Sequence, residues 1–359
     1  NKRLGEAIGA LPIVGSMMLA IGYTVVMSWI FKYCWMGISG SLYAMGTDMA
    51  TIGGTFGGTA PEAETLGEAL SMMFSNGIFG IGNGVWLIVG LVASLAIMAF
   101  GVGNGIEKAN KVMMPALFFL FVILGIYICT LPGASEGYKY IFTLKPEGLL
   151  NPQVWVFAFG QAFFSLSVAG NGSVIYGSYL PKDEDLPSSA RNVALFDTIA
   201  ALLAAIVIIP AMAVILGDGI VGMKGGPGLM FVYLVNVFNA MPGGQLWGAL
   251  FFVFLFFAAL STVTAVFENI LACWMDRFGI SIGRAVLANL VLIFLLSLPC
   301  LLGNNLWSGV KALGMGIMDW EDFLVSNNLL PIGSMIYLLF CCVSRKYGWG
   351  YDHFLEEAN

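Results

Sequence analysis

Polar side chains interrupt one apolar segment of the chain, from Trp155 to Tyr179. Between Ser165 and Ser173 this segment holds three serines, one asparagine and two glycines. Each glycine weakens a helix by about 1 kcal/mol relative to alanine, and serine hydroxyls compete for backbone hydrogen bonds. A helix broken here would offer carbonyl oxygens to a cation and a helix N-terminus to an anion. We therefore predict a broken helix that lines a binding site; the alternative is a face of small residues for helix packing.

Other apolar segments also carry oxygen-bearing side chains. Asp197 stands among leucine, isoleucine and alanine residues, and a carboxylate in lipid is costly enough to be functional by default. Asp197 would bind a cation, or be neutralised by a proton or by a buried partner. Glu268 is a second such acid, whose contacts the sequence does not identify. Ser261 and Thr262 follow Ala258 by three and four residues, so two hydroxyls and a carbonyl could bind a hard cation or simply bond to one another.

The elements that carry these residues are expected to be membrane helices. Of 359 residues, 59% are hydrophobic and 10% are charged, whereas soluble domains are about a quarter charged. Eight apolar segments are long enough to cross about 30 Å of hydrocarbon. They are residues 11–38, 84–103, 113–132, 153–180, 190–216, 245–274, 282–302 and 324–343. The sequence thus predicts an all-α integral membrane protein, with the lipid bilayer as its partner and without the basic surface that nucleic acid requires.

The distribution of lysine and arginine predicts the orientation of these helices. With the N-terminus in the cytoplasm, ten of the fifteen basic residues lie inside and five outside. The outer five are Lys32, Lys139, Lys145, Lys224 and Lys311. Both ends of the chain are then cytoplasmic, and short outer loops without usable glycosylation sites favour a multi-pass protein of a prokaryotic cell (inner) membrane. In the outer connection 217–244, the apolar run from Leu229 to Phe238 predicts a short helical hairpin.

Four motifs, in order along the chain, resemble those of the neurotransmitter:sodium symporters. Gly105 and Pro115, separated by nine residues, are similar to a motif of the family's fifth helix. Gly160-Gln161-Ala162-Phe163-Phe164-Ser165-Leu166-Ser167, followed by Tyr176-Gly177-Ser178-Tyr179, resembles the sixth helix. Phe256-Phe257-Ala258-Ala259-Leu260-Ser261-Thr262 resembles the eighth, and Asp319-Trp320-Glu321-Asp322, with Asn327 and Leu330-Pro331, resembles the tenth.

This resemblance implies the inverted-repeat fold of the bacterial leucine transporter, represented here by helices three to ten. The first two helices and the last are missing, so we expect the chain to be an internal fragment of a longer protein. Residues 1–150 would be the remainder of the first repeat, 151–345 the second repeat and 346–359 a cytoplasmic loop, all within one transporter domain.

The resemblance also implies roles for individual residues in the substrate site. Leu19 and Tyr23, one helical turn apart, would line the site, with the Tyr23 hydroxyl donating to the substrate carboxylate. Phe164 would be the aromatic lid. Further contacts with substrate would come from Ser165, Ser167, Val168, Gly170, Thr262 and Val266. Gly170 replaces a phenylalanine of the leucine transporter, and with its neighbour Asn171 it would enlarge the pocket.

Ion and gate residues follow from the same resemblance. Ser165 and Asp197 would bind the first sodium ion, and Asp197 would supply the negative charge that chloride brings to some relatives. The second sodium ion would lie between Ala258, Ser261 and Thr262. Asp322 matches the outer-gate aspartate, and local unwinding between Gly105 and Pro115 would open a water path to the inside.

We therefore predict a symporter that moves a neutral amino acid or a related small amine by alternating access, with sodium and without a requirement for chloride. A proton-coupled or sodium-independent permease on the same scaffold stays open, with Asp197 and Glu268 as proton carriers. A ligand-sensing receptor without transport stays open too. An enzyme is not expected, because the sequence offers no nucleophile with a base and no metal-ligand cluster, and its single histidine, His353, is in the tail.

Overall fold

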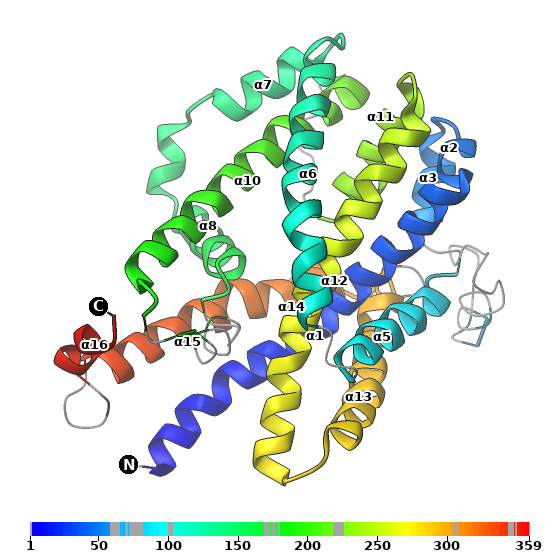
Figure 1. Ribbon diagram of the computed structural model, residues 1–359. Coiled ribbons are helices and arrows are strands. Elements are labelled where there is room, and N and C mark those ends of the chain that lie inside the picture. The colour runs from blue at the N-terminus through cyan, green and yellow to red at the C-terminus, as the bar shows by residue number, and fades with distance from the viewer. Residues whose placement is uncertain are drawn as a thin grey trace.

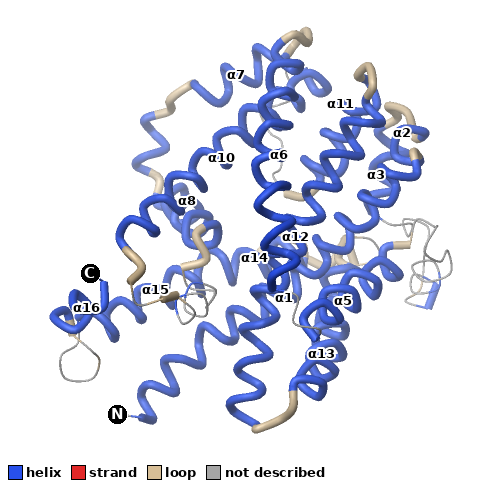
Figure 2. Tube along the Cα trace, in the orientation of Figure 1, coloured by secondary structure: helices blue, strands red, loops and turns tan. Residues whose placement is uncertain are grey.

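The computed structural model describes residues 2–57, 82–99, 103–168, 183–217, 226–304, 307–343 and 350–358, and a few isolated residues between these ranges. Within them the chain is helical, and the one β-type pairing is an isolated bridge between Ala312 and Met315. Figure 1 shows long helices that cross one another at steep angles, and Figure 2 shows that short loops join them. The expected all-α fold is confirmed for this part of the chain.

Six helical stretches among the described residues are long and apolar enough to cross a membrane. They are α1 (Lys2–Ser39), α6 (Gly103–Cys129), α10 (Leu186–Leu216), α12 (Gly244–Phe278), α13 (Ile282–Leu302) and the stretch Ile317–Val343. The last consists of α14 (Ile317–Leu324), the π-helical segment η4 (Val325–Leu329), α15 (Leu330–Tyr337) and the π-helical segment η5 (Leu338–Val343). The two other expected spans correspond to the shorter helices α5 (Asn83–Ala99) and α8 (Pro152–Ser165), so the count of eight stays a prediction.

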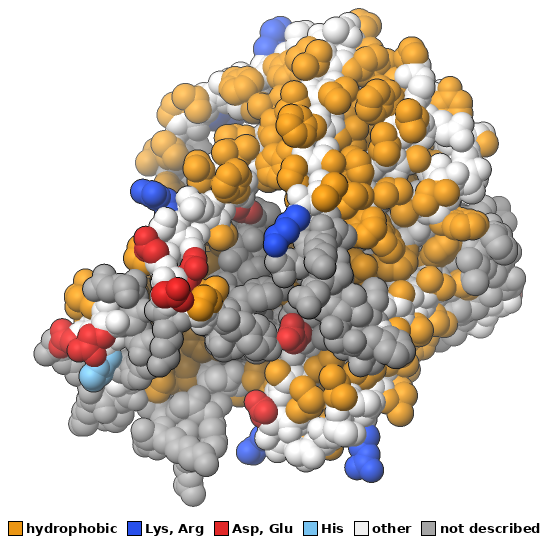
Figure 3. Space-filling view, viewed as in Figure 1, with side chains coloured by type: hydrophobic (Ala, Val, Ile, Leu, Met, Phe, Trp, Pro, Cys, Tyr) orange, Lys and Arg blue, Asp and Glu red, His pale blue; other side chains and the backbone are white. Residues whose placement is uncertain are grey.

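The centre of the molecule is the contact between α1 and α12. α1 also packs on α5 and α13, and α12 packs on α6. On the other side, α10 contacts α6 and the short helix α7 (Ala134–Phe142), while α8 lies against η4 and α15. Apolar side chains cover most of the visible surface around α6, α10 and α12 in Figure 3. Large apolar side chains are exposed on these helices, among them Phe119 of α6 and Phe196 of α10. A bilayer would cover this surface.

An aromatic cluster closes one end of the α1–α12 contact. Trp29 of α1 packs on Phe56 of α3 (Met49–Gly57) with ring centroids 4.7 Å apart. Tyr33 of α1 lies 5.0 Å from Phe231 and 5.3 Å from Phe252 of α12. All of these rings are fully buried except that of Phe56, which is partly buried, and together they tie α1, α12 and the connection after α10 into one core.

The outer connection after α10 is helical, as its apolar run predicted. Leu229–Leu234 forms the π-helical segment η3, and Val235–Ala240 forms α11, which continues it in the same direction. Phe231, Leu234 and Val237 are buried, which explains why a loop needs this apolar run. The expected hairpin is not present in residues 226–240, because η3 runs directly into α11; residues 218–225 lie outside the described part.

A further expectation is wrong in this structure, and one lysine is buried more deeply than lysines usually are. Lys32 is 1% exposed inside α1, where Nζ donates to the carbonyl of Thr55 at 2.6 Å and to Oδ1 of Asn83 at 2.7 Å. The local unwinding expected between Gly105 and Pro115 is not present, because α6 is helical from Gly103 to Cys129 through both residues. Proline removes one backbone donor, and the rest of this 27-residue helix keeps its turns in place.

Candidate sodium and substrate site

The helix break predicted after Phe164 is confirmed. The Asn151 side chain caps the start of α8 by accepting from the backbone N–H of Gln153 at 3.0 Å. The helix ends at Ser165, and Ser167 adopts a left-handed conformation with φ 53°, which is costly for a residue that is not glycine. The C-terminal end of a helix carries partial negative charge on its last carbonyls. This break therefore provides a place where a cation is stabilised.

Ser165 meets Asp197 at this break. Its hydroxyl donates a short hydrogen bond to Oδ1 of Asp197, which lies in the first half of the unbroken helix α10. Ser165 is exposed and Asp197 is half-buried, so both oxygens can be reached from the space beside the end of α8. Residues 32 positions apart in sequence thus place a carboxylate and a hydroxyl together at the negative end of a helix, a combination suited to a hard cation such as sodium.

The hydroxyls of α12 converge on one carbonyl oxygen. Ser261 Oγ lies 2.8 Å and Thr262 Oγ1 lies 3.1 Å from the carbonyl oxygen of Ala258. Both hydroxyls donate to it, which is the local bonding that the sequence left open as an alternative. The three oxygens still form one cluster on a half-exposed turn of α12. A cation that binds this cluster must replace the two hydroxyl hydrogen bonds, because the carbonyl and both hydroxyl oxygens would then face the ion.

Tyr23 connects α1 to this turn of α12. Its side chain hydrogen-bonds to that of Thr262, so a residue expected to bind substrate contacts one expected to bind sodium. Leu19 and Tyr23 pack with Val266 in one apolar cluster between α1, α5 and α12. Val266 is 8% exposed and lies one turn beyond Thr262. Four of the expected site residues are therefore neighbours on two facing helices.

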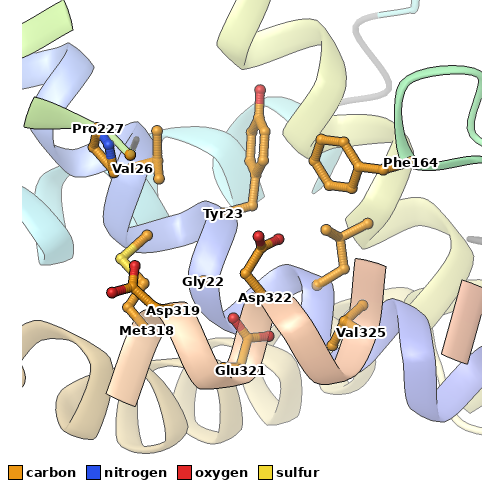
Figure 4. Close-up of a pocket in the computed structure, with 12 residues that line it drawn as sticks. Gly22, Tyr23, Val26, Phe164, Pro227, Met318, Asp319, Glu321, Asp322 and Val325 are labelled. Atoms are coloured by element: carbon orange, nitrogen blue, oxygen red, sulfur yellow. The ribbon is translucent and has the colours of Figure 1, made fainter. Parts of the chain in front are cut away.

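A cavity of about 210 Å³ adjoins these residues on the side of α14. Leu19, Tyr23, Phe164 and Asp322, all expected at the substrate site or its gate, line it together with Val325. Figure 4 shows the rings of Tyr23 and Phe164 on one side and Asp322 of α14 on the other. Asp322 accepts a hydrogen bond from Ser326 Oγ at 2.7 Å, which fixes its carboxylate relative to η4. Single π-helical turns of this kind occur often at functional sites.

The remaining expected residues are described by their position and exposure. Ser167 and Val168 are exposed just after the end of α8, and Glu268 is half-buried on α12, two residues beyond Val266. Gly170 and Asn171 lie outside the described residues. Only the helical backbone of Gly105 is described, so its part in the site stays a prediction.

Among the cavity residues that the sequence did not assign to the site, two lie against each other. Glu321 lines it from α14 and is 8% exposed, and Gly22 lines it from α1. The sequence held a signal for Glu321, because three acids occur within four residues from Asp319 to Asp322. Gly22 gave no signal, since its role depends on which helix packs on it.

Comparison with solved structures defines the class of protein. The fold matches that of MhsT in complex with L-phenylalanine, with a TM-score of 0.81 and 33% sequence identity. The match covers 98% of this chain and 74% of that one. Together with its apolar helices, this makes the chain a multi-pass α-helical membrane protein of the MhsT fold.

Sequence comparisons identify the family. The model of the sodium:neurotransmitter symporter family matches residues 60–358. An uncharacterized sodium-dependent transporter of Bacillus subtilis (strain 168), YhdH, is 34% identical over 334 residues, which are 92% of this chain and 68% of that protein. The human inactive sodium-dependent neutral amino acid transporter B(0)AT3 is 28% identical, over 76% of this chain and 51% of its own length. The chain belongs to the sodium:neurotransmitter symporter family, whose members are secondary transporters and not enzymes.

Proposed function

We propose that this protein is a sodium-coupled symporter that carries a neutral amino acid by alternating access. The observation that supports this proposal most strongly is the hydrogen bond between Ser165 and Asp197 at the end of α8. A carboxylate, a hydroxyl and the negative end of a helix meet there, beside residues that line a cavity. The neutral amino acid is proposed because MhsT binds L-phenylalanine and several relatives are named as amino acid transporters.

The substrate would lie between Tyr23, Phe164 and Val266. Tyr23 would turn its hydroxyl from Thr262 to the substrate carboxylate, and Phe164 would cover the bound molecule. A first sodium ion would bind at Ser165 and Asp197, and a second at Ala258, Ser261 and Thr262. Asp197 carries a fixed negative charge beside the first ion, so chloride is not required to balance it. Asp322 would pair with a cation when the outer gate closes.

Uptake into sealed vesicles tests the proposal. The full-length protein is reconstituted, and labelled neutral amino acids are offered with an inward sodium gradient, or with potassium in its place. Accumulation above equilibrium with sodium alone is the expected result, and replacement of chloride by gluconate should leave it unchanged. Accumulation driven equally by a proton gradient without sodium would favour a proton-coupled permease, while binding without accumulation would favour a receptor.

A further inference from the structure

A buried carboxyl group lies where α14 packs on α1. Glu321 is 8% exposed, lines the cavity beside Asp322, and has no hydrogen-bond partner for Oε1 among the described residues. Its other oxygen, Oε2, lies over the Cα of Gly22, 2.5 Å from the point where a Cβ would stand. Figure 4 shows Glu321 and Asp322 on one turn of α14, next to Gly22 of α1. The absence of a side chain at Gly22 is therefore what makes room for this carboxyl.

The groups around Glu321 are acidic or neutral. On its own helix, Asp319 and Asp322 share the cavity of about 210 Å³ with it. α1 presents the phenol of Tyr23, and α13 presents the buried thiol of Cys300. From η4, the Ser326 hydroxyl is directed to Asp322 and not to Glu321. No lysine or arginine is among the described residues that line the cavity.

These surroundings favour the neutral form of the carboxyl. An ionised carboxylate removed from water is far more costly than a protonated one unless a cation or several donors compensate it. Two neighbouring carboxylates add repulsion, because like charges in one cavity oppose each other's ionisation. A protonated carboxyl, in contrast, carries its own donor and tolerates the apolar contact with Gly22.

We propose that Glu321 is a proton-binding site, occupied when α14 is packed on α1. Release of this proton leaves a charged carboxylate that needs water, so it is favoured when the α1–α14 contact at Gly22 opens and water reaches Glu321. Proton occupancy is thereby linked to the state of the cavity beside Phe164 and Asp322. The site is distinct from Ser165 and Asp197, and it does not depend on sodium or on transport.

Infrared spectroscopy of the full-length protein in lipid, recorded over a pH series without substrate, tests the proposal. The C=O stretching band of a protonated carboxylic acid should be present at neutral pH in the wild type and lost in Glu321→Gln. Asp319→Asn removes an exposed carboxyl from the same helix and cavity, and should leave the band in place. A wild type without this band, or a band that persists in Glu321→Gln, overturns the proposal; the first result would show an ionised carboxylate compensated by a cation.

A second pair of variants keeps the test decisive if Glu321→Gln does not fold. Gly22→Ala places a methyl group where Oε2 now lies, so the carboxyl must move into the cavity, where water can reach it. The band should then titrate away at a pH lower by roughly one unit, which is a tenfold change in proton affinity. Gly9→Ala on the same helix, where a Cβ meets nothing within 4 Å, is the matched control and should titrate as the wild type does. Equal titration of all three proteins would contradict the proposal.

Discussion

Gly160 sets the distance between α8 and η4, and its replacement by alanine is a direct test of this packing. A Cβ at Gly160 would lie 1.9 Å from Oδ1 and 2.8 Å from Cα of Asn327. The amide oxygen can rotate away, but the Cα is backbone and cannot. Ordinary contact begins near 3.4 Å, so by subtraction (3.4 − 2.8) the two segments must separate by about 0.6 Å. Overpacking of this kind costs about 1–3 kcal/mol.

The matched control is Gly125→Ala, at another buried glycine inside a membrane helix. A Cβ there meets Val207 Cγ2 at 3.6 Å, which is ordinary contact. Both variants gain the same preference of alanine for helix, about 1 kcal/mol, so the difference between them isolates the overpacking. We expect Gly160→Ala to unfold at a lower temperature than Gly125→Ala in detergent, by an amount that corresponds to about 1–3 kcal/mol.

The same substitution should affect sodium binding. Ser165 follows Gly160 by five residues on α8, so a displaced helix moves its hydroxyl away from Asp197 on α10. Sodium should then be needed at higher concentration to support substrate binding in Gly160→Ala but not in Gly125→Ala. Equal thermal stability of the two variants would refute the reasoning, because the backbone of Asn327 would not then limit the approach of α8.

Three further predictions concern single contacts. In a double-mutant cycle of Ser165→Ala and Asp197→Asn, the effects of the two substitutions on the free energy of sodium binding should not add, and the coupling energy should be about 1–2 kcal/mol. Additive effects would mean that the two side chains act separately. Thr262→Val should raise the sodium concentration needed for substrate binding roughly tenfold, which corresponds to a loss of about 1.4 kcal/mol. Thr264→Val, whose hydroxyl donates to the carbonyl of Ser261, should not change it. Similar effects of both variants would argue against the second sodium site. Lys32→Met leaves the Thr55 carbonyl and Asn83 Oδ1 without this donor, which should destabilise the protein by about 1–3 kcal/mol and lower its thermal unfolding midpoint. Lys139→Met at the surface should change the midpoint little. An unchanged midpoint in both variants would show that the buried ammonium group does not stabilise the packing of these segments.

The sequence allowed the spanning helices and the break after Phe164 to be predicted because both are local properties. Long apolar runs specify helices in lipid, and the serines and glycines after Phe164 do not support a continuous helix. The end of α8 at Ser165 confirms this prediction. The proximity of Ser165 and Asp197 is of another kind: it came from family resemblance, since nothing local brings positions 165 and 197 together.

The residues that were missed or misjudged depend on packing between distant segments. The burial of Lys32 could not be predicted, because lysine is usually solvated and only the folded chain brings the oxygens of Thr55 and Asn83 to its ammonium group. Glu321 is buried only because Gly22 of α1, some 300 residues earlier, leaves space for it. Pro115 was expected to unwind α6, yet that helix, which packs on α10 and α12, continues through the proline.

In the proposed function, sodium and an amino acid bind together, and Asp197 is a sodium ligand. Thermal unfolding of the full-length protein, measured with each of the common amino acids while sodium is titrated against potassium, tests it most directly. At least one neutral amino acid should raise the unfolding midpoint only when sodium is present, and Asp197→Asn should shift this effect to higher sodium concentration. Stabilisation that is equal in sodium and in potassium would contradict it.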